Sequence, residues 1–223
     1  MREMIAFVPA RSGSKRIRDK NLLVIDGVSL IRRTLLLLKD IGFSDIVLST
    51  DCYQYYNEAK DLNVNLDLRN VTYSTDFTST SEVLVDWIER RVISEEALIF
   101  LWQVTSPFRT RKLVREFIYR AQSLQFGEML MCVSEISKIS SINENNSIYP
   151  IDYSFGSRSQ DVKTTLVKEN GLGYALMAKT LYAERSLFPD RVIPFITNSF
   201  CLDLDIDEER DYIISKTLIE NGI

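Results

Sequence analysis

Short apolar runs alternate with amphipathic segments of about ten residues along most of this chain, and this alternation constrains the fold more than any other feature. The expected strands have apolar centres and cover residues 5–9, 45–50, 97–102, 129–133, 174–177, 192–196 and 200–205. The expected helices cover residues 30–38, 55–62, 83–88, 112–124 and 208–221, and residues 181–188 connect the expected strands at 174–177 and 192–196. Strands connected through helices form right-handed crossovers, so we expect an α/β fold: a mostly parallel sheet with helices on both faces.

Helix start signals support this division. Ser29 and Thr110 precede apolar helical runs and are expected N-caps, and Ser79 with Glu82 has the spacing of a capping box. Gly42 is a stop signal for the first helix. At 223 residues, the chain is long enough for one α/β core, and we treat residues 1–223 as a single domain.

The composition excludes several classes of function. The chain contains no His, which excludes a Ser-His-Asp hydrolase and a His-liganded zinc site. Its 27 Lys and Arg against 31 Asp and Glu give a net charge of −4, which argues against a dedicated nucleic-acid binder. A local basic pocket for a small anion remains compatible with this balance.

The three cysteines are scattered, and an odd number cannot pair completely into internal disulfides. A reducing compartment is therefore expected. The first residues show no signal-peptide core, and no apolar run approaches the roughly 18 residues of a membrane helix. We expect a cytoplasmic protein without a membrane partner.

Residues 134–163 interrupt the regular pattern with Ser, Asn and Pro among isolated apolar residues. About thirty residues without a helical period inside a compact domain indicate a functional or interaction element. Our preferred interpretation is an antiparallel excursion that packs on a second subunit. A flexible surface loop is the alternative.

The first candidate site follows the first strand. Ligands of parallel sheets bind beyond the carboxyl ends of the strands, and here residues 9–21 place five cations beside Gly13 and two Ser hydroxyls. Exposed N–H groups, hydroxyls and cations suit phosphate oxygens. A solvated basic loop is the alternative, but the position after a strand favours a phosphate cradle. The loop is neither a Walker A motif nor a dinucleotide GxGxxG motif.

A second group follows the strand at residues 97–102. Gln103 can donate to and accept from a polar ligand, and Arg109 can support a loop or bind an anion. An ordinary hydroxyl-rich turn before the next helix explains this stretch nearly as well.

The third group is acidic. Asp203, Asp205 and Asp207 alternate in an expected extended segment, which concentrates negative charge on one side. Hard oxygen ligands at this spacing suit Mg²⁺. The alternative is helix capping, with Asp207 as the N-cap of the closing helix. The glycine and terminal Glu of an EF-hand loop are missing.

These groups together resemble acylneuraminate cytidylyltransferases, the CMP-sialic acid synthetases. The motifs that carry the resemblance occur in that family's order along nearly the whole chain: Arg11-Ser12-Gly13-Ser14-Lys15, Lys20-Asn21, Gln103-Val104-Thr105-Ser106-Pro107-Phe108-Arg109, Arg158-Ser159-Gln160-Asp161, Asn170-Gly171 and Asp205-Ile206-Asp207. The resemblance implies the Rossmann-like fold of nucleotide-diphospho-sugar transferases, a homodimer, and residues 134–163 as an arm that reaches the partner's active site.

The resemblance also implies an activity: transfer of CMP from CTP to the anomeric hydroxyl of a nine-carbon 2-keto acid sugar, an N-acylneuraminate, with release of pyrophosphate. The implied nucleotide and phosphate ligands are Arg11, Lys15, Lys20 and Asn21. The implied nucleotide or sugar contacts are Arg69, Ser79, Gln103, Arg158, Gln160 and Asn170. Asp205 and Asp207 would hold Mg²⁺. Arg11 and Lys20 would assist catalysis, and Asp207 is a hypothesis for the base.

One departure bears on the acceptor, because Leu172 replaces the family's usual Ala after Asn-Gly at the expected sugar pocket. A sister cytidylyltransferase for legionaminic or pseudaminic acid is therefore the first alternative. A glycosyltransferase with an Asp-x-Asp metal site and a nucleotide-binding regulator without turnover are the others.

Overall fold

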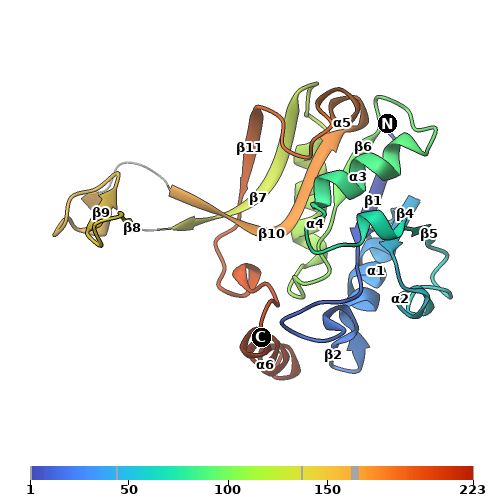
Figure 1. Cartoon of the computed structure of the whole chain (residues 1–223), viewed down its shortest axis with the longest axis horizontal. Helices are drawn as coiled ribbons and strands as arrows, with labels where there is room; N and C mark the ends of the chain where they lie inside the picture. The colour runs from blue at the N-terminus through green and yellow to red at the C-terminus, as the bar shows by residue number, and fades with distance from the viewer. Residues whose placement is uncertain (1, 44, 137, 162–165, 223) are drawn as a thin grey trace.

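A computed structural model describes residues 2–43, 45–136, 138–161 and 166–222. Its centre is a seven-stranded sheet in the order β11-β7-β10-β6-β1-β4-β5 (Figure 1). The strands are β1 (Met4–Pro9), β4 (Asp45–Thr50), β5 (Asn65–Leu68), β6 (Leu98–Leu101), β7 (Glu128–Ile136), β10 (Leu166–Met177) and β11 (Arg191–Ile196). Within this sheet β10 pairs antiparallel with both neighbours, and the other pairs are parallel. The predicted mostly parallel α/β sheet is confirmed.

Helices cover both faces of the sheet. α1 (Leu30–Ile41) and α4 (Arg111–Ala121) pack on one face, and α3 (Thr80–Glu89) and α5 (Ala178–Glu184) pack on the other. β1 shows how one strand serves both layers: Ala6 and Val8 face α1 and α4, whereas Ile5 and Phe7 face α3 and α5. Burying each large apolar side chain contributes roughly 1.5–3 kcal/mol, so both layers stabilise the strand.

Shorter elements connect this framework. They are η1 (Lys20–Leu22), the hairpin of β2 (Val24–Ile25) and β3 (Val28–Ser29), α2 (Tyr53–Asn57), η2 (Val71–Tyr73), η3 (Ser159–Asp161), η4 (Cys201–Asp203) and the closing helix α6 (Glu209–Glu220). Among the described residues, no helix has both the length and the apolar character needed to cross a bilayer.

The predicted helix boundaries at three starts and one end are confirmed. Ser29 and Thr110 accept hydrogen bonds from backbone N–H groups of α1 and α4 at 3.2 Å each, and Ser79 forms the expected capping box at α3. Gly42 has a φ of +99°, a left-handed conformation that suits glycine and ends α1.

Other boundaries differ. The strand expected at residues 200–205 is wrong, because its backbone folds locally into η4, where Asp203 N–H bonds to the carbonyls of Ser199 and Phe200. β5, the β2–β3 hairpin and the helix α5 at Ala178–Glu184 were not predicted.

The segment at residues 134–163 forms a projecting arm. β7 and β10 continue past the sheet as an antiparallel ribbon, and β8 (Ile139–Ile142) pairs with β9 (Ile148–Ile151) at its tip (Figure 1). An antiparallel excursion is therefore present, although its first residues belong to β7. Residues 137, 162 and 163 of this segment lie outside the described residues. Packing on a second subunit stays a prediction.

Candidate active site

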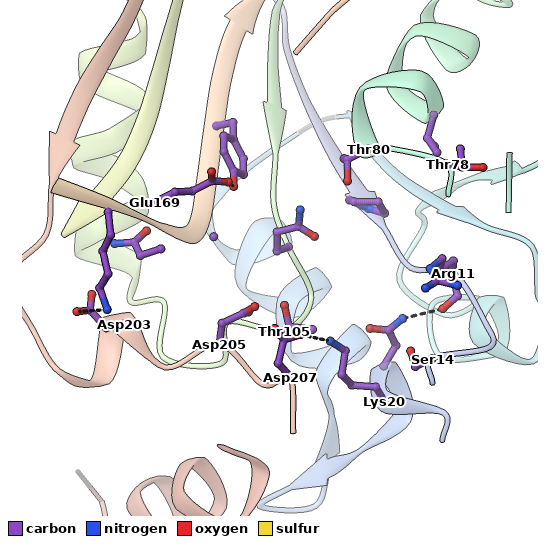
Figure 2. A pocket seen from close by; sticks show the side chains of 18 of the residues that line it. Arg11, Ser14, Lys20, Thr78, Thr80, Thr105, Glu169, Asp203, Asp205 and Asp207 are labelled. Carbon is purple, nitrogen blue, oxygen red and sulfur yellow. Dashed lines mark hydrogen bonds and ion pairs between the residues drawn. The ribbon is translucent and has the colours of Figure 1, made fainter. Parts of the chain in front are cut away.

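A cavity of about 550 Å³ opens at the carboxyl ends of the central strands, where bound ligands of parallel sheets lie. Most of the predicted site residues line it: Arg11, Lys20, Asn21, Arg69, Gln103, Asn170, Asp205 and Asp207. Figure 2 shows Arg11 and Ser14 on one side of the cavity, Asp205 and Asp207 below, and Glu169 and Asp203 on the opposite side.

The basic loop after β1 is held in place by its own polar groups. Ser12 donates from both its backbone N–H and its hydroxyl to Asp51, at 2.7 Å each, which ties the loop to the end of β4. The Asn21 amide donates to the carbonyl of Arg11 at 3.0 Å. Gly13 has a φ of +72°, which a residue with a side chain rarely adopts. These contacts hold the loop in a conformation that places Arg11, Ser14 and Lys20 at the cavity.

Two cations of this loop pair with a carboxylate from the segment after η2. Asp76 accepts from Arg11 Nη2 at 2.8 Å and from Lys15 Nζ at 2.6 Å. The hydrogen bond from Lys15, followed by that from Arg11, lowers the pKa of Asp76. Lys15 and Asp76 line a second hollow of about 360 Å³ that adjoins the cavity and shares Arg11, Lys20 and Asp207 with it.

The acidic group lies directly beside the basic loop, although the two are far apart in the sequence. Lys20 Nζ is 2.9 Å from Asp207 Oδ1 (Figure 2). Arg16 is 3.3 Å from Asp207 Oδ2. Asp207 is not the helix cap that the alternative interpretation required. Glu208 occupies that position, and Asp211 accepts from the N–H groups of both Asp207 and Glu208.

Asp205 differs from Asp207 in its environment. Desolvation raises its pKa, and the nearby Asp207 carboxylate raises it further. Among the described residues, no Lys or Arg forms an ion pair with it within 4 Å. The described residues also include no group of three Asp, Glu, Cys or His side chains arranged for a metal. Two carboxylates nevertheless suit Mg²⁺, which usually takes one or two and completes its shell with phosphate oxygens and water.

The opposite wall comes from β10. Asn170 is buried, and its amide nitrogen donates to Ser134 Oγ at 2.8 Å and to Thr197 Oγ1 at 2.7 Å. This nitrogen is therefore engaged by the protein, and Asn170 shapes the wall. Gln103 is half-buried at the end of β6 and lines the same cavity.

The sequence interpretation missed Lys168, Glu169 and Tyr174 on this wall. Lys168 pairs with Asp203 at 3.3 Å, and the Tyr174 hydroxyl donates to Glu169. Burial raises the pKa of Tyr174, so its hydroxyl stays protonated. Their position beside Asn170-Gly171 was the available signal, but the sequence pattern did not reveal that β10 extends so far.

Arg69 combines cavity lining with a structural role. It is buried, and it donates to the hydroxyl and the carbonyl of Ser49 at 2.9 Å each. Desolvation lowers its pKa to about 10, so it stays charged at neutral pH.

Some predicted site residues lie elsewhere. Ser79 does not line the cavity, because its hydroxyl caps α3. Arg158 and Gln160 lie exposed on the arm, where Arg158 pairs with Asp161 at 2.8 Å. Leu172 is fully buried in the core beside the cavity, so the expected contact with the sugar pocket is wrong.

Comparisons with known proteins agree with this geometry. A family model described as "Cytidylyltransferase" matches residues 5–219. The N-acylneuraminate cytidylyltransferase of Streptococcus agalactiae serotype V is 27% identical over 98% of the chain, which spans only 54% of that protein. The CMP-N,N'-diacetyllegionaminic acid synthase of Legionella pneumophila is 26% identical, covering 97% of this chain and 96% of that protein.

The fold also matches a solved structure. CMP:2-keto-3-deoxy-manno-octonic acid synthetase complexed with CTP superposes with a TM-score of 0.71 at 14% identity, covering 99% of this chain and all of that one. At this identity the likeness establishes the shared fold.

Proposed function

The chain belongs to the cytidylyltransferase family, and we propose that it transfers CMP from CTP to the anomeric hydroxyl of a sialic-acid-like sugar, an N-acylneuraminate, with release of pyrophosphate. One observation carries this proposal: Arg11 and Lys20 of the loop after β1 and the carboxylates Asp205 and Asp207 line one cavity, with Lys20 2.9 Å from Asp207. A polyanion and a divalent cation are the ligands that such a pairing accommodates.

The basic loop supplies the phosphate contacts. Arg11, Lys15 and Lys20 can neutralise the triphosphate and the charge that grows on the departing pyrophosphate. Asp205 and Asp207 are the residues that would hold Mg²⁺, which would screen the phosphate charges when bound. Positioning would supply the rest of the catalytic effect, with both substrates bound in this cavity and the sugar hydroxyl directed at the α-phosphorus.

The proton of the attacking hydroxyl needs an acceptor, and Asp207 remains our proposal for it. Arg16 and Lys20 already form ion pairs with Asp207. A substitution that removes the carboxylate charge of Asp207 therefore tests the proposed role as base. Asp207→Asn that keeps near-normal turnover at saturating Mg²⁺ excludes this role, whereas a loss of turnover without a loss of CTP affinity supports it.

Lys168 is the cation on the wall of the cavity formed by β10, away from the basic loop. We propose that it binds the carboxylate of the 2-keto acid. Lys168→Gln is then expected to raise KM for the acid about tenfold, because a charge-assisted contact is lost, and to leave KM for CTP unchanged. Lys179→Gln, which breaks an exposed pair with Glu96, is the matched control.

The acceptor acid has a second candidate. The chain spans about half of the Streptococcus relative but 96% of the Legionella enzyme, whose name specifies N,N'-diacetyllegionaminic acid. The 26% identity to this enzyme supports a legionaminic acid as the alternative acceptor of the same chemistry, and the 26% identity to the pseudaminic acid cytidylyltransferase of Campylobacter jejuni supports pseudaminic acid equally.

One assay separates these possibilities. Pyrophosphate release is measured with each ribonucleoside triphosphate, Mg²⁺ and N-acetylneuraminic, legionaminic or pseudaminic acid. Release that requires CTP and one of these acids supports the proposal, and the preferred acid gives the acceptor. Tight CTP binding without release across the panel would show a regulator, and hydrolysis of a finished nucleotide sugar would show a glycosyltransferase.

The arm supports the predicted homodimer. At its tip, Ile142, Ile148 and Tyr149 are 68, 58 and 50% exposed on the β8–β9 hairpin, which is apolar surface that a second subunit can bury. Sedimentation of the whole protein tests this, and Ile142→Lys combined with Ile148→Lys is expected to give monomers. A monomeric unaltered protein at micromolar concentration contradicts the dimer.

A further inference from the structure

A smaller cavity of about 180 Å³ lies between α1 and the loop after β6. Its lining residues are Arg33, Thr34, Leu37, Ser106, Pro107 and Arg109. None of them lines the 550 Å³ cavity. The lining therefore holds two guanidinium groups and two hydroxyls but no carboxylate.

Arg109 is the buried member of this pair, with 8% of its surface exposed. Its Nε donates to the carbonyl of Leu172 at 2.8 Å, and its Nη1 is 3.5 Å from Thr34 Oγ1. Its Nη2 is buried without a hydrogen-bond partner. Desolvation lowers the pKa of Arg109 to about 10, which leaves it charged at neutral pH.

Arg33 is the second cation. Its Nη2 donates to the carbonyl of Ile25 at 2.9 Å, while its Nε is buried without a partner. Across the part of the chain that the structure describes, neither Arg33 nor Arg109 forms an ion pair within 4 Å. By contrast, Arg32, next to Arg33 on α1, forms a pair with Asp61 at 2.7 Å.

Two cations that share a cavity repel each other and are poorly solvated unless an anion lies between them. Guanidinium groups match the oxygens of phosphate-like anions, and Ser and Thr hydroxyls add donors. Since one water occupies about 30 Å³, a cavity of 180 Å³ admits a small ion but no nucleotide. We propose that this cavity binds a small tetrahedral oxyanion of the phosphate class.

The proposed site touches the wall of the larger cavity. Ser106 Oγ is 3.4 Å from both Asp205 Oδ1 and the carbonyl of Gly171, and Arg109 holds the carbonyl of Leu172. The inference does not rest on the proposed reaction, because the anion site is built from other side chains. Free phosphate and pyrophosphate are two sources of the same ligand chemistry.

Calorimetric titration with inorganic phosphate tests the site on the intact protein. Phosphate also meets the cations of the larger cavity, so the comparison is between variants. Arg33→Gln is expected to remove one binding equivalent or weaken it by roughly tenfold or more. Arg32→Gln removes the same charge one residue away and is expected to leave that equivalent intact. Thr34→Val, which keeps the side-chain volume, is expected to weaken it less.

Equal phosphate binding by Arg33→Gln and Arg32→Gln, both shown to be folded by their thermal unfolding, would overturn the proposal. Crystals grown with selenate give a second readout. An anomalous peak between Arg33 and Arg109 supports the site, and its absence while the larger cavity is occupied overturns it. If pyrophosphate competes with phosphate for the site that Arg33→Gln removes, pyrophosphate is also a ligand of this site. If pyrophosphate does not compete, the site is assigned to free phosphate.

Discussion

Gly173→Ala is expected to destabilise the protein by overpacking, because β10 lies directly against an indole ring. A methyl carbon at Gly173 would lie 2.6 and 2.8 Å from two ring carbons of Trp102. Trp102 is fully buried, with Phe100 stacked at 6.3 Å and Phe117 edge-on at 5.4 Å between ring centroids. The ring therefore has little room to retreat.

Overpacking of this kind costs about 1–3 kcal/mol of unfolding free energy. In a chain of this length each kcal/mol shifts Tm by about 2–4 °C, so Gly173→Ala is expected to lower Tm by roughly 2–12 °C. Urea titration monitored by intrinsic fluorescence measures the free energy. An unchanged denaturant slope shows that the loss belongs to the native state.

A double substitution isolates the cause. Trp102→Phe removes the part of the ring that Gly173 contacts, so in that background Gly173→Ala is expected to cost about 1 kcal/mol less than alone. Strictly additive effects, or an unchanged midpoint for Gly173→Ala alone, would refute the steric reasoning.

Three further predictions concern local electrostatics, capping and reactivity. Asp76→Asn frees Arg11 and Lys15 for phosphate and is expected to tighten CTP binding roughly two- to fivefold in calorimetry at low salt, with no effect at high salt. Ser79→Ala is expected to lower the free energy of unfolding in urea by about 1 kcal/mol, because α3 loses its N-cap. A raised KM for CTP at unchanged stability would instead show that Ser79 contacts the substrate. Burial raises the pKa of Cys132 to about 12, so Cys132 stays a thiol at pH 8. We therefore expect Cys132 to resist iodoacetamide in the folded protein, and rapid alkylation of Cys132 detected by mass spectrometry would contradict this.

The central sheet was predictable because its strands are buried on both faces and their apolar runs are continuous. The stretch at residues 200–205 also has strand-like apolar residues, but it joins none of the strands that the structure describes. Its backbone groups instead bond within η4, apart from Ile206 N–H, which reaches the carbonyl of Thr105 at 2.9 Å. The outer half of β10 was missed for the opposite reason, since Val167, Lys168 and Glu169 pair with β7 outside the core and need no apolar period.

The site was predictable where position along the sheet determines it. Residues after β1 and β6 and around Asp205 lie at one edge, so their types already indicated a polyanion and a metal. Asp76 and Lys168 enter through tertiary contacts of a loop and an arm, which spacing along the chain does not encode. Ser79 was expected both to cap a helix and to contact a substrate. The structure shows the helix cap, and Ser79 does not line the cavity.

The two cavities differ in how their positive charge is balanced. At the larger cavity and the hollow that adjoins it, each cation proposed to bind phosphate already has a carboxylate partner: Asp76 for Arg11 and Lys15, and Asp207 for Lys20. A triphosphate that binds there would have to replace these ion pairs with its own, so its affinity would depend on the charge it carries relative to the two carboxylates. The smaller cavity has no such internal anion between Arg33 and Arg109 among the residues described. An oxyanion bound there would pair with two guanidinium groups without displacing an existing ion pair, whereas a ligand of the larger cavity displaces the pair of Lys20 with Asp207.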